Sequence, residues 1–132
     1  MNFFRINKID NLSSMVKAIE KYAGFSVIRL SGSFDFNTIP PIEDIIKKNQ
    51  EHLDQDVVLD FKDVTRIDTS TLAVLIYIIN RLKHKHRSLS LINCNKLVKE
   101  YIRIGKLESV IRIHDTLTDA LNKAKEEEMN HG

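Results

Sequence analysis

The sequence of 132 residues has no tryptophan, one cysteine, four glycines and two prolines. The single cysteine, Cys94, cannot form an intrachain disulfide, which excludes a small scaffold held together by disulfides. The longest apolar run, Leu72 to Ile79, has eight residues, whereas a membrane-spanning helix needs roughly 20. Residues 1–8 contain no apolar segment with a small-residue cleavage site, so we expect no secretory signal.

Positive and negative charges are nearly balanced. Twenty Lys and Arg against 18 Asp and Glu give a formal net charge of +2, too even a balance to favour the phosphate backbone of nucleic acid as a partner. A hydrophobic fraction of 42% and a charged fraction of 29% are ordinary for a globular chain and exclude general disorder. We therefore expect one soluble, cytoplasmic domain that neither binds nucleic acid nor inserts into a membrane.

The first clear pattern is a β-hairpin. Phe25 to Leu30 has the alternation of a half-buried strand, Val16 to Tyr22 is its candidate partner, and Ala23-Gly24 can form the turn. Residues 1–14 precede this hairpin as either an added edge strand or a loose arm. Because an unpaired edge strand invites pairing, these residues are also a candidate element for a homodimer.

From Ser31 on, helical and strand patterns alternate. We expect helices at 38–53, 72–82, 96–104 and 117–125, and strands at 57–61, 89–93 and 110–113. Asn95 and Thr116 are placed to cap two of the helices, and Gly105 to end one in a left-handed turn. Helix 72–82 is apolar nearly all round, which predicts that it is more deeply buried than its neighbours. Such alternation builds a mostly parallel sheet with right-handed crossovers, so the predicted fold is a small α/β domain of about five strands and four helices.

Three hydroxyl residues stand where a buried strand gives way to an apolar helix. We expect the strand to end soon after Asp60 and a short loop to lead to Thr69, Ser70 and Thr71 at the start of the helix. Hydroxyls there can accept hydrogen bonds from free backbone N–H groups. The partial positive charge of a helix start would also tolerate a phosphate. From local chemistry alone, plain capping is the commoner explanation of this pattern.

Together with two further segments, this pattern resembles the STAS domain of bacterial anti-sigma factor antagonists. That family shows a strand ending in Asp, a loop, and Asp-Ser-Ser-Gly-Leu at a helix start, which Asp60 and Ile67–Leu72 match here. Upstream, Arg29–Asp35 resembles the family's Leu-x-Gly-x-Leu-Asp. The remaining matches are Thr38, Leu97–Leu107 and Ile113–Leu121. The STAS-like domain would then cover residues 16–125, with an N-terminal extension at 1–15 and a frayed tail at 126–132.

The resemblance implies a protein-binding switch and not an enzyme. In such antagonists the unmodified domain binds a kinase-type anti-sigma factor and frees a sigma factor, and phosphorylation of the hydroxyl after the loop Asp breaks the complex. That residue is Thr69 here, with Ser70 as the second candidate, and Asp35, Asp68 and Thr71 would join them in the partner-binding surface. Thr69 stands where the family has Ser, and Thr71 where it has Gly. The alternative is a non-switching STAS scaffold in a signalling assembly or a cytoplasmic subunit of a lipid transporter.

The other candidate sites are weaker. His84 and His86 lack the further ligands that a metal needs, and the basic run Arg81–Arg87 is typical of a solvated helix end. Cys94 has no companion thiol, and the pair His114-Asp115 has no nucleophile beside it. We predict no metal, no cofactor and no catalytic residue, and a small α/β enzyme is the weakest of the three function classes.

Overall fold

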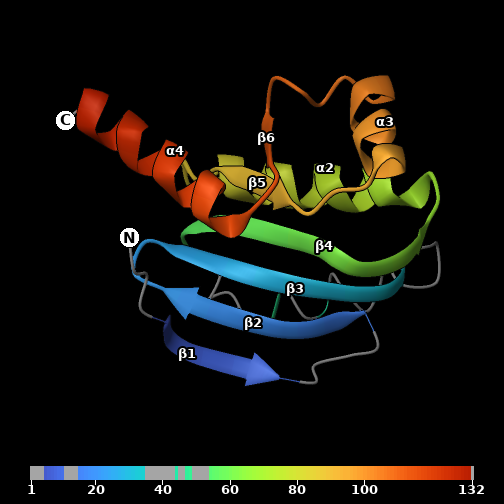
Figure 1. Ribbon diagram of the computed structural model, residues 1–132, viewed down its shortest axis with the longest axis horizontal. Coiled ribbons are helices and arrows are strands. Elements are labelled where there is room, and N and C mark those ends of the chain that lie inside the picture. Colours follow the sequence, from blue (N-terminus) through green and yellow to red (C-terminus); the bar gives the residue numbers. More distant parts are fainter. Residues whose placement is uncertain (1–4, 11–14, 35–43, 45–46, 49–53, 132) are drawn as a thin grey trace.

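The computed structural model describes residues 5–10, 15–34, 44, 47–48 and 54–131. Six strands lie in one sheet in their sequence order (Figure 1): β1 (Arg5–Asp10), β2 (Val16–Tyr22), β3 (Phe25–Phe34), β4 (Asp56–Ile67), β5 (Leu89–Ile92) and β6 (Ile111–His114). The first three strands pair antiparallel, and β3 to β6 pair in parallel. In the described ranges the helices are α2 (Ser70–Lys83), α3 (Lys96–Ile104) and α4 (Leu117–His131). The predicted α/β fold with a mostly parallel sheet is confirmed.

One strand more than the five predicted, β1, decides between the alternatives left open for residues 1–14. β1 pairs with β2 from Arg5, opposite Tyr22, to Asp10, opposite Ala18, with one register shift between Arg5 and Asn7, so part of this segment is an edge strand. The predicted hairpin of β2 and β3 is confirmed, and Gly24 in its turn has the positive φ of 89° that favours glycine. The homodimer through this edge stays a prediction. The helix predicted at 38–53 lies largely outside the described residues.

The helices divide between the two faces of the sheet. Because right-handed crossovers that always step in the same direction keep their helices on one face, α2 and α3 cover the same side. Their buried side chains join one core with strand residues, among them Val74, Leu75 and Ile102. α4 covers part of the other face through Ala120 and Leu121. As predicted, the helix at 72–82 is more deeply buried than the neighbouring α3, with five buried residues in α2 against two in α3. One face of α2 is exposed, since Ile76 is 44% exposed.

β4 has 12 residues, more than twice the length of the strand predicted at 57–61. It therefore includes residues that we expected to form a loop after Asp60. Its second half pairs with the end of β3, with Ser31 opposite Asp63 and Phe34 opposite Ile67. The register shifts twice along this pair, which accommodates the irregular polar pattern. The exposed polar residues of 62–66 hid this half of the strand, since its only buried anchor is Ile67. The helix α2 therefore starts almost directly at the end of a strand.

Two helix caps are as predicted and one helix end is not. Asn95 Oδ1 accepts the N–H of Val98 at 2.9 Å, and Thr116 Oγ1 accepts the N–H of Asp119 at 3.1 Å.

The left-handed turn predicted at Gly105 is wrong: its φ is −75°, and Lys106 carries the positive φ of 57°. Glycine is needed at 105 for space, because a Cβ there would lie 2.9 Å from Leu72 Cδ2 and 3.2 Å from the Tyr101 carbonyl oxygen. This close contact joins the end of α3 to the start of α2. α4 continues through residues 126–131, and the fraying of this tail stays a prediction.

Candidate functional site

The candidate site lies where β4 passes into α2, beside the end of β3. The backbone N–H of Asp68 donates to the carbonyl oxygen of Phe34 at 3.2 Å. The chain position after Phe34 is Asp35, so the two segments of the family pattern meet here in space. Asp35 and Thr38 themselves lie outside the described residues, and the predicted role of Asp35 in partner binding stays a prediction.

A carboxylate, and not the predicted hydroxyls, caps the start of α2. Asp68 Oδ1 accepts the backbone N–H of Ser70 at 2.8 Å and also the Ser70 hydroxyl. Thr69 stands at the N-cap position and its side chain makes no capping hydrogen bond. The reason is local geometry: Thr69 already has helical φ and ψ of −62° and −20°, whereas a capping side chain needs an extended backbone. Asp68, one residue earlier, takes the role.

The three hydroxyls therefore have three different surroundings. Thr69 is exposed and Ser70 is half-buried, with its hydroxyl engaged by Asp68. Thr71, which we expected in the partner-binding surface, is fully buried. An exposed hydroxyl with no capping role is the group best placed to receive a phosphoryl group, and the positive end of α2 would stabilise the added charge.

Thr71 carries a buried polar atom without a partner. Its Oγ1 has no hydrogen bond within the described part of the chain, and a buried hydroxyl left unpaired costs about 1–3 kcal/mol. We expect Thr71→Val, which keeps the branched shape, to raise the free energy of unfolding by about 1 kcal/mol. Urea denaturation of the two proteins checks this, with Thr118→Val on exposed α4 as the control. A lower stability of Thr71→Val would contradict the assignment of an unpaired hydroxyl.

An apolar stripe continues from Thr69 along the outer face of α2. Ala73 and Ile76 lie four and seven residues after Thr69, so all three share one helix face. All three are exposed, Ile76 with 44% of its surface. Leu72 lies beside them and contacts the end of α3 at Gly105. We refer to Thr69, Ala73 and Ile76 as the Thr69 stripe.

A buried ionic network lies behind the site, and no sequence pattern predicted it. Arg29 on β3 binds Glu20 on β2 through Nε and Nη2, each at 3.2 Å, and Asp60 on β4 through Nη1 at 2.8 Å. Tyr22 donates to Glu20 at 3.0 Å, and Asn93 donates to Asp60 at 2.8 Å. Glu20 and Asp60 are 7% and 6% exposed. The network ties four neighbouring segments of the sheet together.

Arg29 sets the charge state of this network. Burial by itself would raise the pKa of Glu20, but the hydrogen bonds and charge of Arg29 outweigh it and lower that pKa. Burial also opposes ionisation of Asp60, and hydrogen bonds from Asn93, the Lys62 backbone and Arg29 lower its pKa in turn. Both carboxylates are therefore ionised in the fold and depend on their partners for it. The family pattern contains Asp60. The residues that bind Asp60 lie far from it in the sequence, so the spacing of residues could not predict them.

The remaining candidates do not assemble into a site. Burial raises the pKa of the Cys94 thiol to about 12, which keeps it protonated and unreactive. Across the described ranges, no group of three or more His, Cys, Asp or Glu is placed to hold a metal ion. None of the described helices is long and apolar enough to span a membrane.

Comparison with known proteins identifies the family of this domain. A family model for the STAS domain matches residues 17–120, whereas a search of curated proteins returned no match. An anti-sigma factor antagonist from Mycobacterium paratuberculosis has a similar structure, with a TM-score of 0.69, 19% identity, and coverage of 94% of this chain and 95% of that chain.

The anti-sigma factor antagonist SpoIIAA is similar in two structures. Its unphosphorylated form gives a TM-score of 0.61 at 16% identity, covering 94% of this chain and 98% of that chain. The phosphorylated form of SpoIIAA from Bacillus gives 0.59 at 16% identity, covering 93% and 99%. At such identities these structures establish a shared fold.

Proposed function

The chain belongs to the STAS domain family, and from this premise we propose that it is an anti-sigma factor antagonist of the cytoplasm. In this proposal the unmodified domain binds a kinase-type anti-sigma factor and so releases a sigma factor. The kinase then transfers a phosphoryl group to Thr69, and the complex separates. The domain is a binding module in this scheme, and the catalytic groups belong to its partner.

One observation carries the proposal: the exposed Thr69 hydroxyl directly follows Asp68 at the start of α2 and takes no part in capping. A phosphoacceptor must present its oxygen to another protein's active site, so a hydroxyl engaged within the fold is disfavoured. Ser70, the second candidate, donates its hydroxyl to Asp68 and would have to give up that bond. The resemblance to the SpoIIAA fold, which is known in an unphosphorylated and a phosphorylated form, supports phosphorylation of this fold in general.

The test is phosphorylation by the kinase-type anti-sigma factors of the source organism. The chain is incubated with each kinase and ATP, and the product is analysed by intact mass and peptide mapping. We expect one phosphate on Thr69 in the unaltered protein and in Ser70→Ala, and none in Thr69→Val. Because Thr69 makes no capping bond, Thr69→Val should fold like the unaltered protein.

Two results would overturn the proposal. Phosphate on Ser70 alone would move the switch to the other hydroxyl. A lack of binding to every such kinase would leave the scaffold or transporter-subunit role, which pull-down from cells with a tagged chain would then distinguish by the kind of partner recovered.

The Thr69 stripe is the predicted contact surface for this partner. We expect Ile76→Glu to weaken binding at least about tenfold, because it places a charge in the apolar centre of an interface. Isothermal titration calorimetry against the partner measures the change. The matched control is Val110→Glu, a second exposed apolar residue (51% against 44% for Ile76) that lies before β6. Equal losses in the two variants would contradict a contact centred on α2.

A further inference from the structure

A pocket lies at the end of the sheet opposite Thr69, between α2 and β6. It occupies the amino-terminal ends of β5 and β6 and has a volume of about 370 Å³, within the range of roughly 300–1,000 Å³ typical of small-molecule sites. α2 begins at the candidate phosphoacceptor and ends at this pocket with Lys83. Fourteen helical residues span about 21 Å, so the two sites are well separated.

The floor of the pocket is apolar and fixed. Leu82, Leu89 and Ile111 are each at most 4% exposed and come from α2, β5 and β6, and Ile79 adds a half-buried side chain beside them. These residues belong to the main core or pack against it, so the floor cannot collapse to fill the pocket without disturbing the sheet. An apolar body of modest size can therefore bury its surface here.

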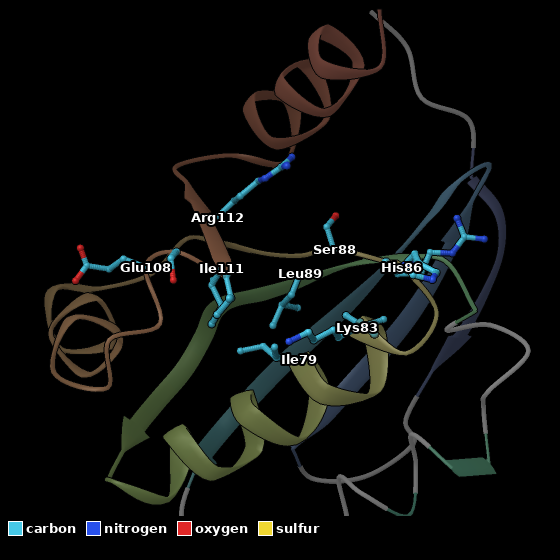
Figure 2. A pocket seen from close by; sticks show the side chains of 12 residues that line it. Ile79, Lys83, His86, Ser88, Leu89, Glu108, Ile111 and Arg112 are labelled. Carbon is cyan, nitrogen blue, oxygen red and sulfur yellow. The ribbon is translucent and has the colours of Figure 1, made fainter. Parts of the chain in front are cut away.

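The polar groups around this floor are mainly cationic. Figure 2 shows Lys83 extending across the pocket towards Leu89 and Ile111, while the carboxylate of Glu108 turns outward. Within the described part of the chain, the Lys83 ammonium group has no ion pair or hydrogen bond. Arg87 and Arg112 also line the pocket.

The helix end explains only part of this charge. Lys83 lies in the last turn of α2, where a cation is stabilised by the helix dipole. Arg87 lies in the following loop and Arg112 on β6, beyond the reach of that effect. Both also line an adjoining hollow of about 460 Å³ beside Ala120 and Leu121 of α4, and in Figure 2 the Arg112 side chain extends towards the start of α4. In a chain with a net charge of only +2, cations from three elements are concentrated at this end of the sheet.

We propose that this α2–β6 pocket binds a small organic anion, whose apolar body packs on Leu89 and Ile111 and whose carboxylate or phosphate is held by Lys83. A recess with an apolar floor favours a small amphipathic molecule over a nucleic acid, which would need an extended basic surface. The proposal does not depend on phosphorylation of Thr69, because it concerns different residues at the other end of α2.

The experiment is a titration of the ¹⁵N-labelled full chain followed by NMR. Octanoate and octyl phosphate are the two anionic probes and distinguish a carboxylate from a phosphate ligand. Inorganic phosphate, which lacks an apolar body, and octylammonium, which carries the opposite charge, are the controls. We expect at least one anionic probe to shift the amide signals of Leu89 and Ile111, and both controls to leave them unchanged.

Variants then test the role of the ammonium group. Lys83→Met keeps the aliphatic length of an exposed side chain and should weaken probe binding about tenfold, as expected for a lost charge-assisted contact. Lys99→Met removes an exposed lysine from α3 and should leave the affinity unchanged. Equal binding of octylammonium, shifts spread over the whole domain, or an unchanged affinity in Lys83→Met would overturn the proposal.

Discussion

Replacing Arg29 by methionine is expected to lower the free energy of unfolding by about 3–5 kcal/mol, because it leaves two buried carboxylates without their cation. Glu20 and Asp60 have side chains that are 10% and 9% exposed, so water cannot replace the lost partner. Methionine keeps most of the apolar stem of arginine, which limits the effect of lost packing. Chemical denaturation at neutral pH measures the change.

The matched control for Arg29→Met is Lys17→Met on the neighbouring strand. Lys17 pairs with Asp63 at 3.2 Å, but the two side chains are 61% and 48% exposed, and an exposed pair contributes less than about 1 kcal/mol. A loss in Arg29→Met no larger than that in Lys17→Met would contradict the importance of the buried network.

The contribution of Glu20 and Asp60 to the free energy of unfolding should change with pH in opposite directions in the two proteins. In the unaltered fold, the pKa values of Glu20 and Asp60 lie below their ordinary values of 4.5 and 3.8. Their contribution to stability is therefore complete above those values and is lost as the pH falls below them. In Arg29→Met, burial without the arginine favours the neutral carboxyls, so acidification relieves the penalty. The difference in stability between the two proteins should be largest near neutral pH and should narrow below about pH 4.

Phosphorylation of Thr69 is expected to weaken partner binding roughly a hundredfold, which corresponds to about 2.7 kcal/mol. The added phosphate carries nearly two negative charges beside Asp68, and an interface centred on the Thr69 stripe would have to desolvate them. The fold should not change, because the start of α2 stabilises the phosphate and no cap is lost. Calorimetry of binding with the phosphorylated and unmodified chains measures the effect.

Thr69→Glu provides a graded comparison for this result. It adds a single charge without the geometry of a phosphate, so its loss of affinity should be smaller, about tenfold. Thr118→Glu on α4 adds the same charge to an exposed threonine away from the site and should bind normally. Full affinity of the phosphorylated chain would refute the switch while leaving partner binding itself intact.

The sequence was informative where structure is decided locally. The hairpin follows from the alternation in Phe25–Leu30 and the glycine in its turn, and the two caps follow from Asn95 and Thr116, whose partners lie three residues away. The position of the hydroxyl residues at the start of α2 was likewise predicted. These features depend on neighbours in the chain, which a pattern can represent.

The features that were missed depend on contacts between distant segments. The second half of β4 exists because the end of β3 pairs with it, and Gly105 is required by Leu72, 33 residues earlier in the sequence. The Arg29 network joins residues that are 9 and 31 positions apart. Asp68 replaced Thr69 as the cap because the backbone became helical one residue early. A local sequence pattern cannot predict contacts between residues so far apart in the chain.

The strand order of the sheet has a consequence for how the chain folds. Every strand pairs with its neighbour in sequence, from β1 to β6, so no strand has to wait for a distant segment before it can join the sheet. Each newly synthesised strand from β2 on finds its partner strand already made. The parallel pairs join residues 22 to 33 positions apart, so they form more slowly than the antiparallel pairs. Truncation at either end would remove an edge strand without opening the middle of the sheet. The domain is therefore suited to assembly in step with its own translation.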